Sequence, residues 1–360
     1  MSTNKHNRPS GGLRISDLRL KLGRFTLGEL ALELEPGEYF VLMGPSGCGK
    51  TSLLRTIAGV YRKHTGSIAV GDRAISPLAP HKRRVGYVPQ TASLFPHLSV
   101  LDNVRFGLAY QKIGAKKCSS RIDRVVKVMG IGHLLDRKPR TLSGGESRRV
   151  ALARSVVTNP DILLLDEPLS MLDTTARSHL LDTLQRLHRE INTVTIHVTH
   201  HCEEAWALNS RCGVMRDGRI IQTGAVDAVF RRPANRFVAE FLGNKNIFPA
   251  TFVTGAKGRE ADLGWARLPL DRPVGTEQGF VHLRPETIRI VSDTAAASAP
   301  NGSFRGVVTH VTDRGIYVDV MIAVGRGAEL SVHVTHQTTP PRAGTEVWLD
   351  CAIPPHAFEG

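Results

Sequence analysis

The sequence has no apolar run near the ~18 residues that a helix needs to cross a bilayer, so it predicts no membrane-spanning helix. Its five cysteines are scattered and form no C-x-x-C pair, which argues against a disulfide framework and favours reduced thiols in a cytosolic compartment. Residues 1–12 are polar and lack the apolar stretch of a signal peptide, so we expect them to be disordered.

The net charge of +14 has three explanations: nucleic-acid binding, attraction to anionic lipid headgroups, or a generally basic proteome. The basic residues are dispersed in short clusters at 82–84, 148–149 and 231–232, without the interleaved aromatic residues of a single-strand binding platform. We therefore expect no nucleic-acid partner. The charge fits better with a protein that acts on an anionic nucleotide at a membrane surface.

One glycine-rich stretch fits the phosphate-loop pattern G-x-x-x-x-G-K-[ST]. Residues 38–43 (E-Y-F-V-L-M) before it predict a buried strand, and residues after Lys50 predict a helix, which is the context this loop needs. Lys50 would reach the β- and γ-phosphates, and the Thr51 hydroxyl would bind Mg²⁺. The alternative is a glycine-rich turn that matches by chance. The predicted nucleotide-binding residues here are Gly44, Pro45, Ser46, Gly47, Cys48, Gly49, Lys50, Thr51 and Ser52.

Two adjacent carboxylates follow four apolar residues, 162–165, that predict a buried strand. Asp166 and Glu167 would then lie at the carboxyl end of that strand, where open α/β sheets place their ligands. Asp166 would hold Mg²⁺ through water, and Glu167 would polarise the attacking water. The alternative is a solvated turn.

A helix is predicted to begin within residues 142–146 (L-S-G-G-E), because Ser143 can cap it and Gly144 and Gly145 expose backbone N–H groups that can hold a phosphate. Gln90 and His200 each end a strand-like run, at 84–89 and 193–199. A lone residue of either type at a strand end is usually only surface, but here each falls where a sensor of the γ-phosphate is needed.

These motifs, in this order, resemble the nucleotide-binding subunit of ABC transporters over residues 13–242. In family terms, residues 44–51 are the Walker A loop, 142–146 the signature, 162–167 Walker B and 170–173 the D-loop. The resemblance implies ATP and Mg²⁺ as cofactors. It implies catalytic roles for Glu167, His200, Gln90 and Lys50, nucleotide contacts from Ser143, Gly144 and Gly145, and metal binding by Thr51, Gln90 and Asp166.

The sequence departs from the family pattern at three places. Leu22 occupies the position of an adenine-stacking aromatic, so it can contact the base but cannot stack, and Phe25 is the candidate substitute. Met171 replaces a common alanine of the D-loop. His201 and Cys202 follow His200 and raise the alternative of a metal site, which we do not expect because neighbouring residues at a strand end point apart.

The expected fold is an α/β P-loop NTPase core with a helical subdomain at about 91–140, followed by a smaller all-β barrel at 243–360. Short helices are predicted at 226–231 and 234–242. A flexible break is predicted at 292–302. Residues 283–286 (L-R-P-E) resemble the TOBE-type barrel that is appended to importer ATPases.

One phosphate loop and one signature cannot serve the same ATP, so the resemblance implies a head-to-tail homodimer. It also implies a separate transmembrane permease reached through residues 95–97, an extracytoplasmic substrate-binding protein, and a peripheral position on the cytoplasmic face of the inner membrane. Residues 22–30, 36–51 and 304–315 resemble molybdate/tungstate importer ATPases. Ferric iron, sulfate and polyamine are alternative cargoes, and a soluble ABC protein of translation or DNA repair is the alternative of another class.

Overall fold

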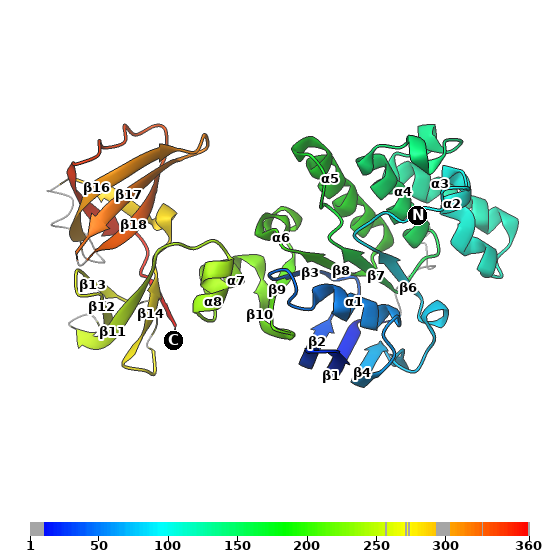
Figure 1. The fold of residues 1–360 in the computed structure, drawn as a ribbon, viewed down its shortest axis with the longest axis horizontal. Coiled ribbons are helices and arrows are strands. Elements are labelled where there is room, and N and C mark those ends of the chain that lie inside the picture. Colours follow the sequence, from blue (N-terminus) through cyan, green and yellow to red (C-terminus); the bar gives the residue numbers. More distant parts are fainter. Residues whose placement is uncertain are drawn as a thin grey trace, which may run out of the picture. The chain divides into compact units, whose positions relative to one another are not determined.

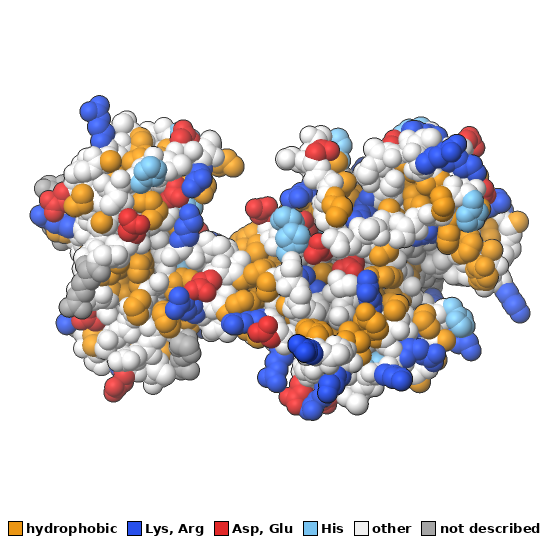
Figure 2. Space-filling model, viewed as in Figure 1, with side chains coloured by type: hydrophobic (Ala, Val, Ile, Leu, Met, Phe, Trp, Pro, Cys, Tyr) orange, Lys and Arg blue, Asp and Glu red, His pale blue; other side chains and the backbone are white. Residues whose placement is uncertain are grey.

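The computed structural model describes residues 11–255, 258–270, 272, 274–292, 303–325 and 327–358. Internal contacts divide the chain into two compact units, Met1–Asp227 and Ala228–Gly360. Residues 1–10 of the predicted disordered N-terminus and residues 293–302 of the predicted break lie outside the described residues. Figure 2 shows Lys and Arg side chains spread over one face of the molecule among acidic and hydrophobic ones.

The N-terminal unit is built on a six-stranded sheet with the order β10-β9-β3-β8-β7-β6. β10 is antiparallel to β9, and the other neighbouring strands are parallel. The strands are β3 (Tyr39–Met43), β6 (Val85–Val88), β7 (Ile162–Asp166), β8 (Val194–Thr199), β9 (Arg211–Arg216) and β10 (Arg219–Ala225). The runs predicted as strands at 38–43, 84–89, 162–165 and 193–199 are therefore confirmed as β3, β6, β7 and β8, with small shifts at their ends.

A four-stranded antiparallel sheet lies on one side of this core, with α1 (Lys50–Ala58) between the two sheets (Figure 1). Its order is β2-β1-β4-β5, from β1 (Leu13–Leu22), β2 (Phe25–Leu34), β4 (His64–Val70) and β5 (Arg73–Ala74). Ile162 and Leu164 of β7 pack into the hydrophobic core on this side, together with Leu53 and Leu54 of α1.

The opposite side of the sheet is covered by helices, and Leu163 and Leu165 of β7 pack into a second core there. The helices of the unit beyond α1 are α2 (Val100–Arg105), α3 (Ala115–Met129), α4 (Gly144–Val156), α5 (Thr174–Ile191) and α6 (Cys202–Leu208). The helical character predicted for residues 91–140 is confirmed by α2 and α3. Among the described residues, no helix is long and apolar enough to span a bilayer.

The C-terminal unit contains two five-stranded sheets that share one hydrophobic core, which includes Phe248, Val320 and Leu349. The first sheet has the order β13-β12-β11-β14-β20, from β11 (Ile247–Gly255), β12 (Gly258–Asp262), β13 (Arg267–Pro269), β14 (Gln278–His282) and β20 (His356–Phe358). The second has the order β15-β19-β16-β17-β18, from β15 (Ile288–Val291), β16 (Ser303–Asp313), β17 (Val318–Val324), β18 (Ala328–Val334) and β19 (Glu346–Cys351). The expected fold class, an α/β core with a smaller all-β domain, is confirmed.

The predicted short helices are present as α7 (Val226–Arg231) and α8 (Arg236–Phe241). The sequence places both at the end of the nucleotide-binding domain, with a boundary at 242/243. By contacts, the division falls earlier, between Asp227 and Ala228, so most of α7 and all of α8 are counted with the C-terminal unit. The boundary at 242/243 therefore stays a prediction.

Candidate active site

The phosphate loop joins β3 to α1, as the sequence predicts. Gly47 and Gly49 have φ angles of 81° and 111°, a left-handed conformation that glycine adopts without strain. A Cβ on Gly49 would lie 2.6 Å from Cζ of Phe25, so glycine is also required there by the close approach of that ring. Lys50 is buried, and its Nζ donates to the carbonyl oxygens of Gly44 at 2.7 Å and Pro45 at 2.9 Å.

The Asp166 carboxylate, at the end of β7, receives a hydrogen bond on each oxygen. Thr51 donates through Oγ1 to Oδ1 at 2.8 Å, and Tyr87 of β6 donates through its hydroxyl to Oδ2 at 2.9 Å. Burial, followed by the charge of Asp166, raises the pKa of Tyr87 to about 12, so its hydroxyl is a donor at neutral pH. No motif marks Tyr87 in the sequence; its position in a strand parallel to β7 was the available signal.

Glu167 lies immediately after β7 with φ of 46°, a backbone conformation that is uncommon outside glycine and occurs often at functional sites. Gln90 donates through Nε2 to Oε2 of Glu167 at 3.0 Å. Nδ1 of His200 lies 3.2 Å from Oε1 of the same carboxylate. The structure thus brings together the three residues that the sequence placed at three separate strand ends.

Arg148 of α4 connects three segments of the site and was also overlooked, because the sequence showed it only as part of a charged pair. It is 4% exposed, and it donates to the backbone carbonyls of Pro89 at 2.6 Å, Gln90, and Glu167 at 3.3 Å. Burial lowers the pKa of Arg148. The start of the segment after β6 is therefore fixed to the signature helix and to the backbone of Glu167, the residue predicted to be the catalytic base.

The signature residues form a regular helix start, as predicted. Ser143 accepts a hydrogen bond on Oγ from the backbone of Glu146 at 3.2 Å, and the Glu146 carboxylate accepts one from the backbone of Ser143 at 2.7 Å. Ser143 and Gly144 are exposed, and Gly145 is half-buried. Within the described part of the chain, no hydrogen bond joins these residues to the phosphate loop.

Leu22 and Phe25 face each other at the turn between β1 and β2, and both are half-buried. The Phe25 ring packs against Gly49 of the phosphate loop. This places the candidate substitute beside the loop, which the sequence alone could not establish. In the D-loop, Met171 is 88% exposed and has φ of 61°.

His201 and Cys202 continue from the switch position. The rings of His200 and His201 lie 4.1 Å apart, and burial raises the pKa of Cys202 to about 11, so its thiol is protonated at neutral pH. Over the described ranges, no group of three His, Cys, Asp or Glu residues is arranged to hold a metal ion.

An aromatic cluster lies beyond Gln90. The ring centroids of Phe95 and Phe106 are 4.5 Å apart, and those of Phe106 and Tyr110 are 5.7 Å apart. Tyr110 is 79% exposed. Arg154 of α4 lies over the Phe95 ring at 5.1 Å and donates to the carbonyl of Ser93 at 2.9 Å.

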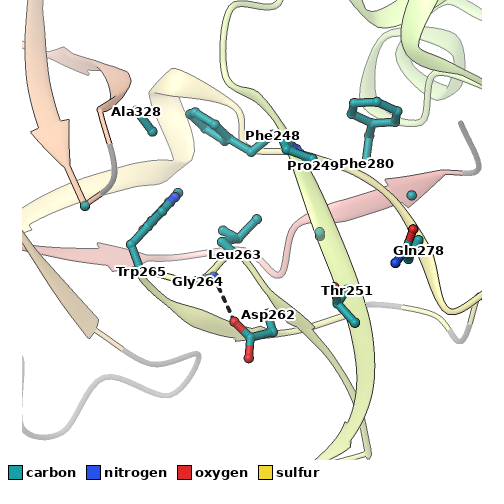
Figure 3. A pocket seen from close by; sticks show the side chains of 13 residues that line it. Phe248, Pro249, Thr251, Asp262, Leu263, Gly264, Trp265, Gln278, Phe280 and Ala328 are labelled. Carbon is teal, nitrogen blue, oxygen red and sulfur yellow. Dashed lines mark hydrogen bonds between the residues drawn. The ribbon is translucent and has the colours of Figure 1, made fainter.

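A wide cavity of about 1070 Å³ lies in the C-terminal unit (Figure 3). Phe248, Trp265 and Phe280 contribute aromatic surface to its wall. Its one acidic residue, Asp262, accepts a hydrogen bond from the backbone of Gly264 at 2.8 Å and pairs with Arg267 at 2.9 Å. The described wall contains no Lys, Arg or His.

Comparison with known proteins agrees with this geometry. Residues 27–170 match the ABC transporter family, and residues 281–354 match the TOBE domain. The molybdate/tungstate import ATP-binding protein WtpC of Pyrococcus horikoshii is 39% identical over 339 residues, which cover 93% of this chain and 96% of that protein. The spermidine/putrescine import ATP-binding protein PotA of Oleidesulfovibrio alaskensis is 37% identical over 311 residues, 84% of this chain and 82% of that protein.

A solved structure is also similar: an ATP-binding cassette in a dimeric post-hydrolysis state bound to ADP and Pi. It superposes with a TM-score of 0.52 and 27% identity, covering 59% of this chain and 98% of that chain. The matched segments contain the phosphate loop, the signature and the acidic strand end described above. The chain therefore belongs to the ABC transporter family, and its N-terminal unit is the ATPase domain of that family.

Proposed function

We propose that this chain drives a molybdate or tungstate importer by binding and hydrolysing Mg²⁺-ATP between two copies of itself. The observation that carries the proposal is the position of Glu167. Its two carboxylate oxygens contact Gln90 and His200, and the Asp166 carboxylate beside it contacts Thr51 of the phosphate loop. A general base, its two sensors and a phosphate loop are thereby assembled at one edge of the sheet.

ATP binds in the loop of residues 44–52. The Lys50 ammonium leaves the carbonyls of Gly44 and Pro45 and turns to the β- and γ-phosphates, which the inward backbone N–H groups also hold. The Thr51 hydroxyl, the Asp166 carboxylate and the Gln90 amide are hard oxygen ligands, which suit Mg²⁺. These residues would hold Mg²⁺, which would supply positive charge to offset the charge that develops on the phosphate oxygens.

Hydrolysis depends on Glu167, which accepts a proton from the attacking water. His200, 3.2 Å from Oε1 of Glu167, orients the γ-phosphate and the carboxylate together. Gln90 senses the γ-phosphate through the amide that contacts Oε2 of Glu167. When the γ-phosphate is lost, Gln90, His200 and Glu167 lose the contacts that they share around it.

Two copies pack head to tail, so that Ser143, Gly144 and Gly145 of one copy contact the ATP held by Lys50 of the other. Two features support this arrangement: the exposed helix start at Ser143, and the dimeric state of the similar cassette that is bound to ADP and Pi. ATP then supplies interface contacts that disappear on hydrolysis, which is the differential affinity that a switch requires.

The chain works as a peripheral subunit on the cytoplasmic face of the inner membrane, with a separate permease and an extracytoplasmic binding protein. The permease contacts the aromatic cluster of Phe95, Phe106 and Tyr110. This surface is suited to coupling because Arg148 and Arg154 of the signature helix bind the backbone of the segment that links the cluster to Gln90. Closure of the dimer is thus passed to the permease.

Molybdate or tungstate is the proposed cargo because the relative named for that import is similar over 93% of this chain. Polyamine is the main alternative, since a relative named for it is 37% identical; ferric iron and sulfate follow. A soluble role in translation or DNA repair is not favoured, because the relatives compared above are named as import proteins.

Uptake by cells of the source organism tests both parts of the proposal. Glu167→Gln should leave ATP binding intact and prolong the ATP-bound dimer while hydrolysis falls by about 100-fold or more. Uptake of radioactive molybdate and tungstate should be lost, and uptake of iron and spermidine retained. Glu190→Gln, which removes an exposed carboxylate on α5, is the matched control. Full ATP turnover by Glu167→Gln would overturn the assignment of Glu167 as general base. Loss of iron or spermidine uptake, with molybdate and tungstate uptake retained, would overturn the proposed cargo.

A further inference from the structure

His200 stands on a short turn between the end of β8 and the start of α6. Its side chain is 40% exposed, so packing alone does not fix the ring at its distance of 3.2 Å from the Glu167 carboxylate. Two hydrogen bonds shape the turn. The backbone N–H of His201 donates to Oγ1 of Thr199 at 3.0 Å, and the backbone N–H of Glu204 donates to the carbonyl of His201 at 3.3 Å.

A buried pair closes this turn at its base. Nε2 of His197, in β8, lies 3.0 Å from Oε2 of Glu204, in the first turn of α6. His197 is 0% exposed and Glu204 is 2% exposed, and glutamates are almost never so buried without a partner. Burial acts to raise the pKa of Glu204, but the hydrogen bond and the charge of His197 outweigh burial, so the pKa is lowered. The pair therefore joins the strand before His200 to the helix after it.

Tyr39 of β3 sets the place of the proton on His197. Its hydroxyl lies 3.0 Å from Nδ1 of His197. Burial, followed by the charge of Glu204, raises the pKa of Tyr39, so the hydroxyl is protonated and can donate to Nδ1. The proton of the neutral imidazole then lies on Nε2, which faces Glu204. Tyr39, His197 and Glu204 thus form a line of polar side chains from β3, the strand before the phosphate loop, to α6.

Stability alone does not account for this pair. Burying two charged groups costs free energy that their attraction offsets only partly, and apolar residues of similar size are often as stable. The pair is better suited to fixing a geometry, because it holds two neighbouring elements at one distance. We propose that Glu204, held by His197, is a positioning residue that keeps the exposed ring of His200 against Glu167. This inference rests on the proposed function, because it concerns the sensor of the bound nucleotide.

ATP hydrolysis by the full chain tests the proposal, with thermal unfolding measured in parallel. Glu204→Leu removes the carboxylate at similar volume, and kcat should fall by about tenfold or more, because a small displacement of a catalytic group can cost that much. The KM for ATP should change by less than about twofold, since the phosphate loop keeps its contacts. Glu204→Gln keeps an oxygen acceptor for His197 and should restore kcat to within about threefold of the parent. An unchanged kcat in Glu204→Leu would overturn the proposal.

Glu203→Leu is the matched control. Glu203 is the preceding residue in the first turn of α6 and is exposed, so its loss changes the net charge and the charge at the helix start equally. It should alter kcat by less than about twofold. If Glu203→Leu lowered kcat as much as Glu204→Leu, the charge at the helix start would be responsible, and the role of the buried pair would be refuted.

A double variant shows whether Glu204 acts through His200. His200→Ala should hydrolyse ATP slowly, and adding Glu204→Leu should lower the single-turnover rate by less than about twofold further, because the ring that Glu204 positions is gone. A further loss as large as that of Glu204→Leu alone would refute the positioning role and leave the proposed function intact. The parent rate in His200→Ala would refute both.

His197→Leu combined with Glu204→Leu covers the case in which Glu204→Leu alone does not fold. Apolar residues in place of a buried pair are often neutral for stability, so this variant should fold and bind ATP. Its kcat should still be lower than that of the parent by about tenfold. Full hydrolysis by the folded double variant would show that the pair does not position His200.

Discussion

The hydroxyl of Tyr87 donates a hydrogen bond across 2.9 Å to Oδ2 of Asp166, on the side of the carboxylate opposite Thr51. Asp166 therefore has both oxygens engaged, and its plane is fixed by residues from β6 and from α1. This contact places a tyrosine of the neighbouring strand against one of the residues proposed to hold Mg²⁺.

Tyr87→Phe should raise the Mg²⁺ concentration needed for half-maximal ATP hydrolysis by about fivefold, because one net hydrogen bond is worth about 1 kcal/mol. The measurement is the ATPase rate as a function of free Mg²⁺ at saturating ATP. Tyr61→Phe is the matched control, since the Tyr61 hydroxyl accepts a hydrogen bond from Arg55 at 3.3 Å. An unchanged Mg²⁺ dependence in Tyr87→Phe would rule out this positioning role.

Arg148→Lys should slow hydrolysis more than it weakens ATP binding, because a lysine cannot reach the carbonyls of Pro89, Gln90 and Glu167 together. Carbonyls left unpaired in a buried position cost about 1–3 kcal/mol, so thermal unfolding should also occur earlier. Binding calorimetry and hydrolysis rates separate the two effects. Arg149→Lys changes the half-buried neighbour on the same helix. It should neither slow hydrolysis nor lower the temperature of unfolding. Equal losses in ATP affinity and in hydrolysis rate would contradict the proposal that Arg148 acts mainly on hydrolysis.

Phe25→Ala should weaken ATP binding by at least about fivefold, because stacking of a base on an aromatic ring is worth roughly 1–3 kcal/mol. Leu22→Ala should have a smaller effect, since the ring that packs against Gly49 belongs to Phe25. GTP affinity should fall in parallel, because a ring stacks on either base. Dissociation constants by calorimetry decide the matter, and Phe25→Trp should retain affinity. A larger loss of ATP affinity in Leu22→Ala than in Phe25→Ala would mean that Leu22 is the main contact of the base.

Acid should destabilise the C-terminal unit through His282. In the unfolded chain, His282 has its ordinary pKa of 6.5. In the folded chain its pKa is about 4, mainly because of burial. The stabilisation that follows from this pKa difference is complete above pH 6.5. As the pH falls toward 4 it is lost, and the free energy of unfolding decreases by up to about 3 kcal/mol. Urea unfolding of the full chain in chloride buffers at pH 7.5, 6 and 5 measures this loss.

A Trp206→Phe background leaves Trp265 and Trp348, both in the C-terminal unit, as the fluorescent reporters. His282→Gln should show a flatter dependence on pH than the parent, because the glutamine side chain does not titrate. Parallel pH profiles for the two proteins would mean that His282 is not the group responsible.

The sequence predicted the site best where a motif and its flanking structure coincide. The strand, glycines and helix around Lys50, and the apolar strand before Asp166, are local features, and the structure contains both elements. Gln90 and His200 were placed at strand ends by pattern. Their common contact with Glu167 follows from parallel strands that end at one edge.

Other parts depended on distant contacts and could not be predicted. Arg148 appeared as a surface charge, because nothing local shows that it is buried against carbonyls from two other segments. A cavity beside His282 in the C-terminal unit combines residues more than a hundred positions apart, from α7 to β20.

The strand that carries the acidic pair has no free face: Ile162 and Leu164 enter one hydrophobic core, and Leu163 and Leu165 enter the other. A strand packed on both sides cannot tilt or slide without opening space on one of them, and protein interiors are too dense to allow that cheaply. Asp166 is therefore a stationary reference point. Arg148 ties Gln90 to the signature helix as a single unit. We therefore expect Asp166 to keep its place relative to both cores when ATP binds and is hydrolysed.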